Sequence, residues 1–456
     1  MHKLSTSQWI AAGICALVIP ATILTMSYRE RPVTSAPVVM EGLSESLTVQ
    51  HWVFPEEGPK VYAVERHSRP IVDIRLVFDA GSARDQVPGE AYLLSQLLTK
   101  GTKKYSADQI AEKMESVGAR LSVGVDRDKL TISCRSLSDD SALDVILPVL
   151  KEILSTPQIP EESFVLAKNQ LDVQLTRRAD EPKPQVEEAF MATIYGDHPY
   201  GHSVLGTKKS IASITTADLK QFHNKYFTPE NMTVVVVGDA TSGAVDRWIQ
   251  GFIQGMPKGS KPAPLPKLKQ QSKDMKKHVA LESSQTHIRF GLPVEFANDT
   301  DHYKLKVAEQ VLGGGFNSRL FNSVRRDGGL AYHVSANSDG WLAPGPFTIK
   351  LETRAEKADE AVKKVKKVLA ELMEKGPTDE ELSLAKQSVK GQLTLMFSSN
   401  AWIASHLESM AFYDKPLDFF ESYGEHLDTV TAEDVMSVLK QRAPLEKWHL
   451  VTAGPV

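Results

Sequence analysis

The sequence predicts an α+β protein made of two homologous repeats that follow an N-terminal hydrophobic segment. Strand-like and helix-like runs alternate from about residue 49 to the C-terminus. Segments of the first half recur in the second half at a nearly constant spacing, which indicates an internal duplication. A chain of 456 residues has room for roughly two or three domains, so two large repeats fit its length.

Composition narrows the class of protein. The chain is 41% apolar and 24% charged, which is typical of a soluble globular protein and excludes collagen, low-complexity disorder and a polytopic membrane protein. Its net charge is −4 with both signs spread along the chain, so it lacks the basic face of a nucleic-acid binder. The two cysteines, Cys15 and Cys134, give no obvious intrachain disulfide.

The N-terminus reads as an export signal or a membrane anchor over residues 1–30. No charged residue occurs from 4 to 28, and residues 9–26 are nearly all apolar. No A-x-A cleavage site follows, and Ile14 precedes Cys15 where a lipoprotein signal has a small residue, so an uncleaved anchor is favoured. In a bacterium this would place the protein on the periplasmic side of the inner membrane, anchored or secreted to the periplasm.

The body begins after a polar spacer over residues 31–48. A helix is expected to start at Ser106, because Gln109 completes a capping box and Ile110 and Met114 share one face with Val117. The glycine that follows, at position 118, is expected to end it. Strands are expected over residues 71–80, 129–134, 232–239 and 346–353.

Four pairs of segments define the repeat. The run ESFVLAKNQLDVQL at 162–175 is similar to ELSLAKQSVKGQL at 381–393, which sets Leu166 against Leu384 at a spacing of 218 residues. The halves are therefore residues 49–255 and 277–456, each with strands, a helix pair and a last strand, joined by an exposed linker at 256–276. The other equivalent pairs are Ala217-Asp218-Leu219 with Glu433-Asp434-Val435, Val149 with Val368, and Gly238 with Gly454.

The chain resembles the pitrilysin/insulinase family of zinc peptidases, which includes the mitochondrial processing peptidase. The resemblance rests in the first half on FDAGSARDQVPGEAYLLSQLLTKGTKKYSADQIAEKMESVGARLSVGVDRDKLTIS, on DHPYGHSVLG and on VVVVGD. In the second half it rests on GGGFNSRLFNSVRRDGGLAYHVSA. It implies that each repeat is a mostly antiparallel sheet covered by helices, and that the two repeats form a clam-like half-chamber.

The resemblance also implies that the metal site has degenerated. Active members carry H-x-x-E-H on a helix, with two zinc-binding histidines and a glutamate that polarises water. Here the three positions hold Tyr92, Ser95 and Gln96, and the third ligand position falls at about Gln174. A serine has little basicity near neutral pH, and tyrosine and glutamine amide are poor zinc ligands. We expect a pseudo-active site and no metal or cofactor bound by this chain.

No other metal site stands out. His198 and His202 are four residues apart, but Pro199-Tyr200-Gly201 between them indicates a loop. Asp85 and Glu90 flank the degenerate helix and are expected to lack partners. His67, His223, His333 and His406 are scattered.

A run of three glycines precedes an expected helix in the second half. Gly313, Gly314 and Gly315 have no following Lys-Ser/Thr, so a phosphate site is not expected. The resemblance implies that they line the substrate chamber. A plain helix N-terminal turn is the other interpretation.

The resemblance assigns a function to Arg325 and Tyr332, which lie seven residues apart. In the family such a pair reaches toward the zinc site and contacts substrate near the scissile carbonyl. A helix is expected to end at Asp327-Gly328-Gly329, with a strand from about Leu330. Alternatively, Arg325 is a solvated helix-end cation and Tyr332 an ordinary strand aromatic. Arg319 and Arg326 remain alternatives for the arginine.

These features together predict a non-catalytic, substrate-positioning subunit of a heterodimeric zinc peptidase. The H-x-x-E-H partner chain would supply the zinc, and an extended peptide would add to a sheet edge. One alternative is a peptide-binding or scaffold subunit with no peptidase role. Another is a free-standing zinc enzyme, which would contain about one zinc per chain. The further partners expected are peptide substrates and, through residues 9–26, a membrane.

Overall fold

The computed structural model describes residues 38–41, 46–54, 58–269, 274–295 and 299–455. The apolar stretch at 9–26, on which the anchor prediction depends, lies outside these residues. Among the helices that the structure describes, none combines the length and apolar character that crossing a bilayer requires.

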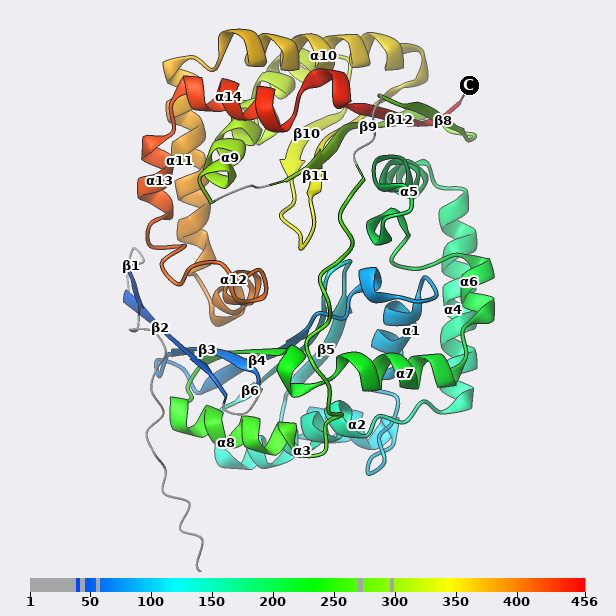
Figure 1. Ribbon diagram of the computed structural model, residues 1–456, viewed down its shortest axis with the longest axis vertical. Helices are drawn as coiled ribbons and strands as arrows, with labels where there is room; N and C mark the ends of the chain where they lie inside the picture. The colour runs from blue at the N-terminus through cyan, green and yellow to red at the C-terminus, as the bar shows by residue number, and fades with distance from the viewer. Residues whose placement is uncertain (1–37, 42–45, 55–57, 270–273, 296–298, 456) are drawn as a thin grey trace, which may run out of the picture. The chain divides into compact units, whose positions relative to one another are not determined.

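The first half is built on a seven-stranded sheet, in the order β1-β2-β3-β7-β4-β6-β5 (Figure 1). Only β3 and β7 pair in parallel, and the other neighbours are antiparallel. The sheet begins with β1, inside the range 31–48 that was expected to be a spacer, so it starts earlier than predicted. The strands are β1 (Val38–Glu41), β2 (Ser46–Val53), β3 (Lys60–Glu65), β4 (Ile71–Phe78), β5 (Arg120–Val125), β6 (Leu130–Leu137) and β7 (Met232–Gly238).

The second half repeats this topology in a five-stranded sheet, in the order β8-β12-β9-β11-β10. β8 and β12 pair in parallel, as β3 and β7 do, and β12, β9, β11 and β10 follow in antiparallel pairs, as β7, β4, β6 and β5 do. This correspondence confirms the duplication. The strands are β8 (Lys276–Ala280), β9 (Gln285–Val294), β10 (His333–Ser338), β11 (Gly345–Arg354) and β12 (His449–Gly454).

The two glycines that ended the repeated segments occupy equivalent backbone positions. Gly238 has φ of +131° and Gly454 has φ of +154°, a region that side chains disfavour. A Cβ on Gly238 would lie 2.1 Å from the carbonyl oxygen of Ile71, and one on Gly454 would lie 2.7 Å from that of Gln285. Ile71 and Gln285 are each the first residue of the neighbouring strand. The close approach of the two strand backbones therefore requires glycine at the same place in both halves.

The helices also correspond. As predicted, α2 (Ala107–Ser116) has a capping box formed by Ser106 and Gln109. Thr215 with Asp218 caps α7 (Thr216–Tyr226), and Thr431 with Asp434 caps α14 (Ala432–Arg442) at the equivalent place. The remaining α-helices are α1 (Glu90–Leu97), α3 (Asp140–Ser155), α4 (Glu161–Ala179), α5 (Pro182–Tyr195), α6 (Lys208–Ser213), α8 (Ser242–Ile253), α9 (Asp299–Gly313), α10 (Ala358–Lys375), α11 (Asp379–Met396), α12 (Asn400–Phe412) and α13 (Tyr423–Thr429).

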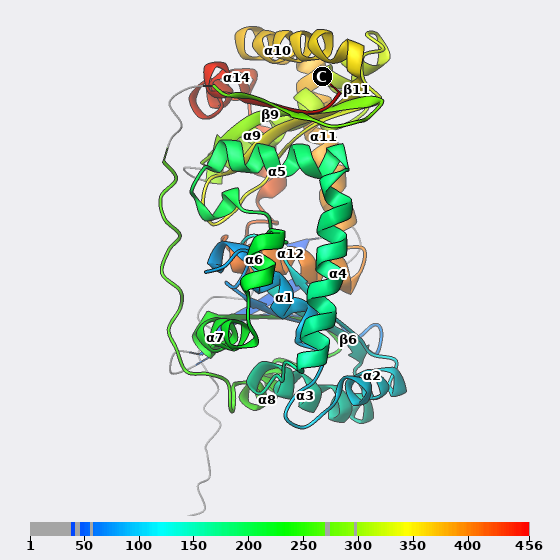
Figure 2. The same cartoon turned by 90° about the vertical axis from the view of Figure 1, so that its right-hand side faces the viewer.

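One helix of each half packs on the sheet of the other half. α5 lies against β12, β9 and β8, whereas α12 lies against β7, β4 and β3 (Figures 1 and 2). Each of these helices forms an ion pair with an arginine of the sheet on which it packs. Arg289 on β9 lies 2.8 Å from Glu187 on α5, and Arg75 on β4 lies 2.5 Å from Glu408 on α12. We call α5 and α12 the exchanged helices.

The exchange explains why β7, a central strand of the first sheet, is buried on both faces. Successive strand residues point to opposite faces, so Val234 and Val236 of β7 join the core of the first half. Val235 and Val237 join the core of the second half, on which α12 lies. Every residue of β7 is buried as a result.

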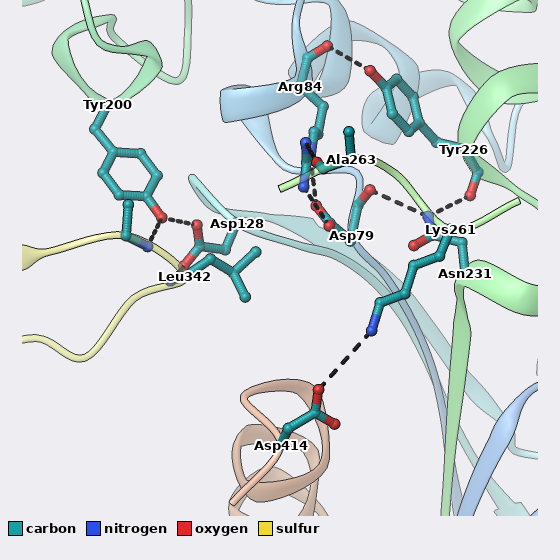
Figure 3. Close-up of polar contacts among 11 residues, drawn as sticks. Asp79, Arg84, Asp128, Tyr200, Tyr226, Asn231, Lys261, Ala263, Leu342 and Asp414 are labelled. Carbon is teal, nitrogen blue, oxygen red and sulfur yellow. Dashed lines mark hydrogen bonds and ion pairs between the residues drawn. The ribbon is translucent and has the colours of Figure 1, made fainter. Parts of the chain in front are cut away.

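Residues 256–269 of the linker run extended beside the two halves, and most of them are exposed (Figure 2). It is bonded at several points. Arg84 Nη1 donates to the carbonyl oxygen of Ala263 at 2.7 Å, and His198 Nε2 lies 3.0 Å from that of Pro266. Lys261 Nζ lies 3.9 Å from Asp414, as Figure 3 shows. The linker is therefore attached to both halves.

Candidate functional site

The four degenerate metal-site positions lie together where α1 faces α4. Tyr92 Oη donates to Oε1 of Gln174 at 3.3 Å, which joins the two helices. Ser95 is buried, and its Oγ donates to the backbone carbonyl of Tyr92 at 2.7 Å and accepts from Gln96 Nε2 at 3.2 Å. These hydrogen bonds link all four positions.

This donor set does not fit zinc. The phenol of Tyr92 and the amide of Gln174 bond each other, and neither offers an imidazole or a carboxylate. Among the described residues, no three His, Cys, Asp or Glu side chains gather closely enough to hold a metal ion. The hydroxyl of Ser95 donates its hydrogen bond to the backbone carbonyl of Tyr92, so it is not available to activate water.

Two acidic residues at the start of α1 have partners that the sequence did not reveal. Asp85 accepts hydrogen bonds from the backbone N–H groups of Gly89 at 2.7 Å and Ala91 at 2.9 Å. Glu90 accepts from the backbone N–H of Gln86 at 2.8 Å. Burial holds the pKa of Asp85 well above its usual value, and burial also raises the pKa of Glu90. The expectation that both lack partners was wrong, because their partners are backbone groups.

The histidines do not form a ligand set. His198 and His202 flank the short 3₁₀ turn η2 (Pro199–Gly201), as the loop prediction required, and His198 Nδ1 accepts from the backbone N–H of Tyr200 at 3.2 Å. Burial lowers the pKa of both. His223 is packed inside the first half, where burial lowers its pKa to about 4. These contacts are those of structural side chains.

Arg325 and Tyr332 flank the glycine turn that ends a helical segment. Arg325 lies in η4 (Phe321–Arg326), a π-helix, with its guanidinium 5.0 Å from the ring centre of Phe321. Gly329, at φ +58°, follows, so the helix ends as predicted. Tyr332 is 59% exposed and lies one residue before β10. Its backbone N–H donates to the carbonyl oxygen of Glu352 at 3.0 Å, which fixes the start of the strand.

The two neighbouring arginines, Arg319 and Arg326, each form an ion pair with an acidic residue. Arg319 makes two 2.7 Å hydrogen bonds to the carboxylate of Glu381, and a third to the carbonyl oxygen of Gly376. Arg326 pairs with Asp327 at 2.8 Å. Among the described residues, no carboxylate pairs with Arg325. Of the three candidates, Arg325 is therefore the one whose charge is not neutralised by a neighbouring acid, and π-helical turns are frequent at functional sites.

The three glycines end α9 and precede the helical segment that contains η4. A Cβ on Gly313 would lie 2.3 Å from the backbone nitrogen of Ala336, so glycine lets α9 approach β10 closely. One on Gly314 would lie 2.3 Å from Oε1 of Gln310. Gly315 has more room, with the nearest atom at 3.7 Å. Helix-to-strand packing accounts for Gly313, and a chamber-lining role for the run stays a prediction.

A buried carboxylate, which the sequence analysis did not single out, joins the two halves. Asp128 lies in the turn between β5 and β6 and is 1% exposed. It accepts from the hydroxyl of Tyr200 and from the backbone N–H of Leu342 at 3.0 Å (Figure 3). It also accepts from the hydroxyl of Tyr413 at 3.1 Å. Tyr200 Oη in turn accepts from the backbone N–H of Ala343 at 3.1 Å. Burial raises the pKa of Asp128 to about 6.

Comparison with known proteins assigns the family. Residues 60–208 match the model of insulinase (peptidase family M16), and residues 213–389 match that of the peptidase M16 inactive domain. A solved structure from Pseudomonas fluorescens, described as a peptidase M16 inactive domain, is 33% identical with a TM-score of 0.85, and the match covers 90% of this chain and 98% of that one. The chain belongs to peptidase family M16, and its residues 213–389 match the domain of that family that is described as inactive.

Two further relatives carry different descriptions. A non-peptidase homolog from Helicobacter pylori is 28% identical over 413 residues, covering 88% of this chain and 93% of that protein. An uncharacterized zinc protease from Mycobacterium leprae is 27% identical over 360 residues, covering 78% of this chain and 80% of that protein. The family thus includes close relatives described as zinc proteases and one described as a non-peptidase.

Proposed function

We propose that this chain is the substrate-positioning, non-catalytic subunit of a two-chain metallopeptidase. The observation that carries the proposal is the contrast between its halves. The positions for metal and base hold Tyr92, Ser95, Gln96 and Gln174, which bond one another, whereas Arg325 and Tyr332 keep exposed polar groups. A chain that has lost one set of groups and kept the other is suited to complete a site whose zinc belongs to a partner with H-x-x-E-H.

The two retained groups suit an oxyanion. A guanidinium and a phenol donate hydrogen bonds, and donors aimed at a developing negative charge lower the barrier to acyl transfer. The peptide would be held extended along the unpaired edge of β5, which ends the first sheet. A periplasmic location, anchored through residues 9–26, belongs to the same proposal, because a chamber outside the cytoplasm would act on exported peptides.

The first experiment is an affinity pull-down of the full-length protein from its native membrane extract, with every co-purifying chain identified by mass spectrometry. We expect a near-stoichiometric chain that carries H-x-x-E-H. If no such chain is recovered, the two-chain peptidase assignment fails.

The second experiment compares arginine variants in the reconstituted pair. Arg325→Ala should lower kcat for peptide hydrolysis by roughly 100-fold, the usual effect of removing one oxyanion donor. Arg326→Ala removes an exposed charge that already pairs with Asp327, so it is the matched control and should leave kcat unchanged. Tyr332→Phe removes only a hydroxyl and should also lower kcat. Equal activity of both arginine variants would contradict the role of Arg325.

A scaffold or peptide-holding subunit without peptidase activity is the second candidate. The relative from Helicobacter pylori that is described as a non-peptidase homolog favours it. Under this alternative, Arg325→Ala would leave the function of the complex intact. The pull-down would then recover partners that lack H-x-x-E-H.

A further inference from the structure

A large cavity in the second half is separate from both sites described above. It has a volume of about 990 Å³ and lies among α11, α12, the segment that leads into α13, and the loop between β10 and β11. Neither the degenerate metal positions nor Arg325 and Tyr332 line it. Ligand sites commonly measure roughly 300–1,000 Å³, so this cavity has room for several side chains.

Aromatic side chains from several segments line part of the cavity wall. Trp402 and His406 lie one turn apart on α12 with their rings stacked at 5.9 Å, and Phe420 meets the ring of His406 edge-on at the same distance. Trp341 and Tyr423 continue the wall from two other segments. Trp402 is 56% exposed and Leu395, on the facing helix α11, is 68% exposed. Large apolar side chains that are exposed at one cavity are typical of a ligand-binding or protein-binding site.

The charges at the cavity are balanced. Lys306 is neutralised by Glu309, whose carboxylate lies 2.7 Å away. The other two formally charged lining residues, Glu295 and Lys415, have opposite signs. Burial, followed by the nearby charge of Arg75, lowers the pKa of His406 to about 4, so its imidazole is neutral near pH 7. A site of this kind favours an uncharged apolar group over a carboxylate-bearing or phosphate-bearing ligand.

We propose that this cavity binds an uncharged aromatic or large aliphatic side chain of an extended peptide, and so selects peptides by an apolar residue. Trp402 and Leu395 are its specificity-determining contacts. The choice of a peptide as occupant rests on the proposed substrate-positioning function. The balanced charge of the wall argues against a fatty acid, whose carboxylate would need an unneutralised cation.

The test measures binding to the isolated full-length chain. The probes are two fluorescein-labelled peptides of eleven residues in a Gly/Ser/Asn background, one with Phe and one with Ala at the centre. Fluorescence anisotropy measures their binding. We expect the Phe peptide to bind about tenfold more tightly than the Ala peptide. Trp402→Ala and Leu395→Ala should each remove most of that preference, and Trp402→Phe should keep it.

The matched control is Leu166→Ala, because Leu166 is also 56% exposed but lies on α4, outside the cavity. It should leave the preference unchanged. Thermal unfolding of each variant checks that the fold is kept, which the exposure of both test residues favours. Equal binding of the two peptides, or a preference that survives in both Trp402→Ala and Leu395→Ala, would overturn the proposal.

Two further outcomes are decisive. Tight binding of laurate without a preference between the peptides would assign the cavity to an acyl chain and overturn the proposal. Because the assay needs no second chain, its outcome is independent of the pull-down. A selective cavity in a chain that recovers no H-x-x-E-H partner would support this inference and reject the two-chain peptidase.

Discussion

At the scale of single residues, Asp128 is a buried carboxyl group that bonds both halves. Three donors from three different segments converge on its carboxylate. Burial opposes its charge, which is why its pKa is raised to about 6 rather than lowered by those donors. The contacts of Asp128 are therefore sensitive to pH.

The raised pKa gives a prediction for stability. A carboxyl whose folded pKa of about 6 exceeds its unfolded value of 3.8 contributes stability below pH 3.8 and loses that contribution as the pH rises through 6. Relative to Asp128→Asn, the free energy of unfolding of the wild type should fall by up to about 3 kcal/mol between pH 4 and pH 7. Urea denaturation at several pH values measures this difference.

The comparison with Asp128→Asn isolates one group. His223 and His406 have lowered pKa values of about 4, so their contributions to stability are lost as the pH falls from 6.5 through 4, the opposite direction. Both histidines are present in the wild type and in the variant, and their effects cancel in the difference. A difference that stays constant over this range would show that Asp128 does not titrate there.

At the residue level, the sequence reveals local patterns more readily than contacts between distant segments. The substitutions at Tyr92, Ser95 and Gln96 can be read from one helix, and the structure brings them together with Gln174 from another. Asp128 was missed because its donors come from loops more than 70 residues away. No pattern along the chain indicates that such groups converge.

At the scale of elements, the exchanged helices are held by buried charge. Glu408 on α12 has a side chain that is only 5% exposed. Its carboxylate forms ion pairs with Arg75 of β4 and, at 2.7 Å, with Lys129 of the β5–β6 turn. It also accepts a hydrogen bond from Thr131 of β6 at 3.1 Å. Burial alone would raise the pKa of Glu408, but Lys129 and Arg75 hold it below its usual value. A carboxylate on a helix of the second half thus neutralises two cations of the first half.

Neutralising this carboxylate should destabilise the protein strongly. Glu408→Gln leaves two partly buried cations without their counter-charge, and breaking such a pair costs about 3–5 kcal/mol. Asp327→Asn is the control, because its ion pair with Arg326 is 62% and 63% exposed and should contribute less than about 1 kcal/mol. Chemical denaturation measures both. Similar losses for the two variants would show that Glu408 does not act as a buried counter-charge.

The repeat at a spacing of 216 to 219 residues correctly predicted which elements correspond. Capping boxes at Thr215 and Thr431 and the glycines at 238 and 454 bear out that prediction in detail. The sequence could not predict the exchange, because an apolar helix face does not specify which of two similar sheets it will cover. For the same reason, the complete burial of β7 became clear only once α12 was placed on it.

At the scale of the whole molecule, the halves are mutually dependent. Two of the three hydrophobic cores combine side chains of both halves, whereas the third contains first-half residues alone. Each half therefore has apolar surface that only the other half covers. The linker adds bonds from Arg84 and His198 to its backbone. These contacts predict one cooperative unit rather than two independent domains.

Cutting the linker tests this dependence. Two fragments divided between residues 259 and 260 should each aggregate when produced alone, since each exposes the sheet face that the exchanged helix of the other covers. Produced together, they should associate one-to-one and unfold in a single transition. Size-exclusion chromatography and thermal unfolding, with the uncut chain as reference, measure both. A soluble first fragment with its own cooperative transition would refute the mutual dependence.

The exchanged helices also set an order of events during synthesis. β7 ends at Gly238 and α12 begins at Asn400, and at 5–20 residues per second a ribosome needs roughly 10–30 s to make the chain between them. Throughout that interval Val235 and Val237 lack the helix that will cover them. The nascent first half therefore exposes this apolar face of its sheet until α12 has been made, whereas α5 is made before the sheet that it covers.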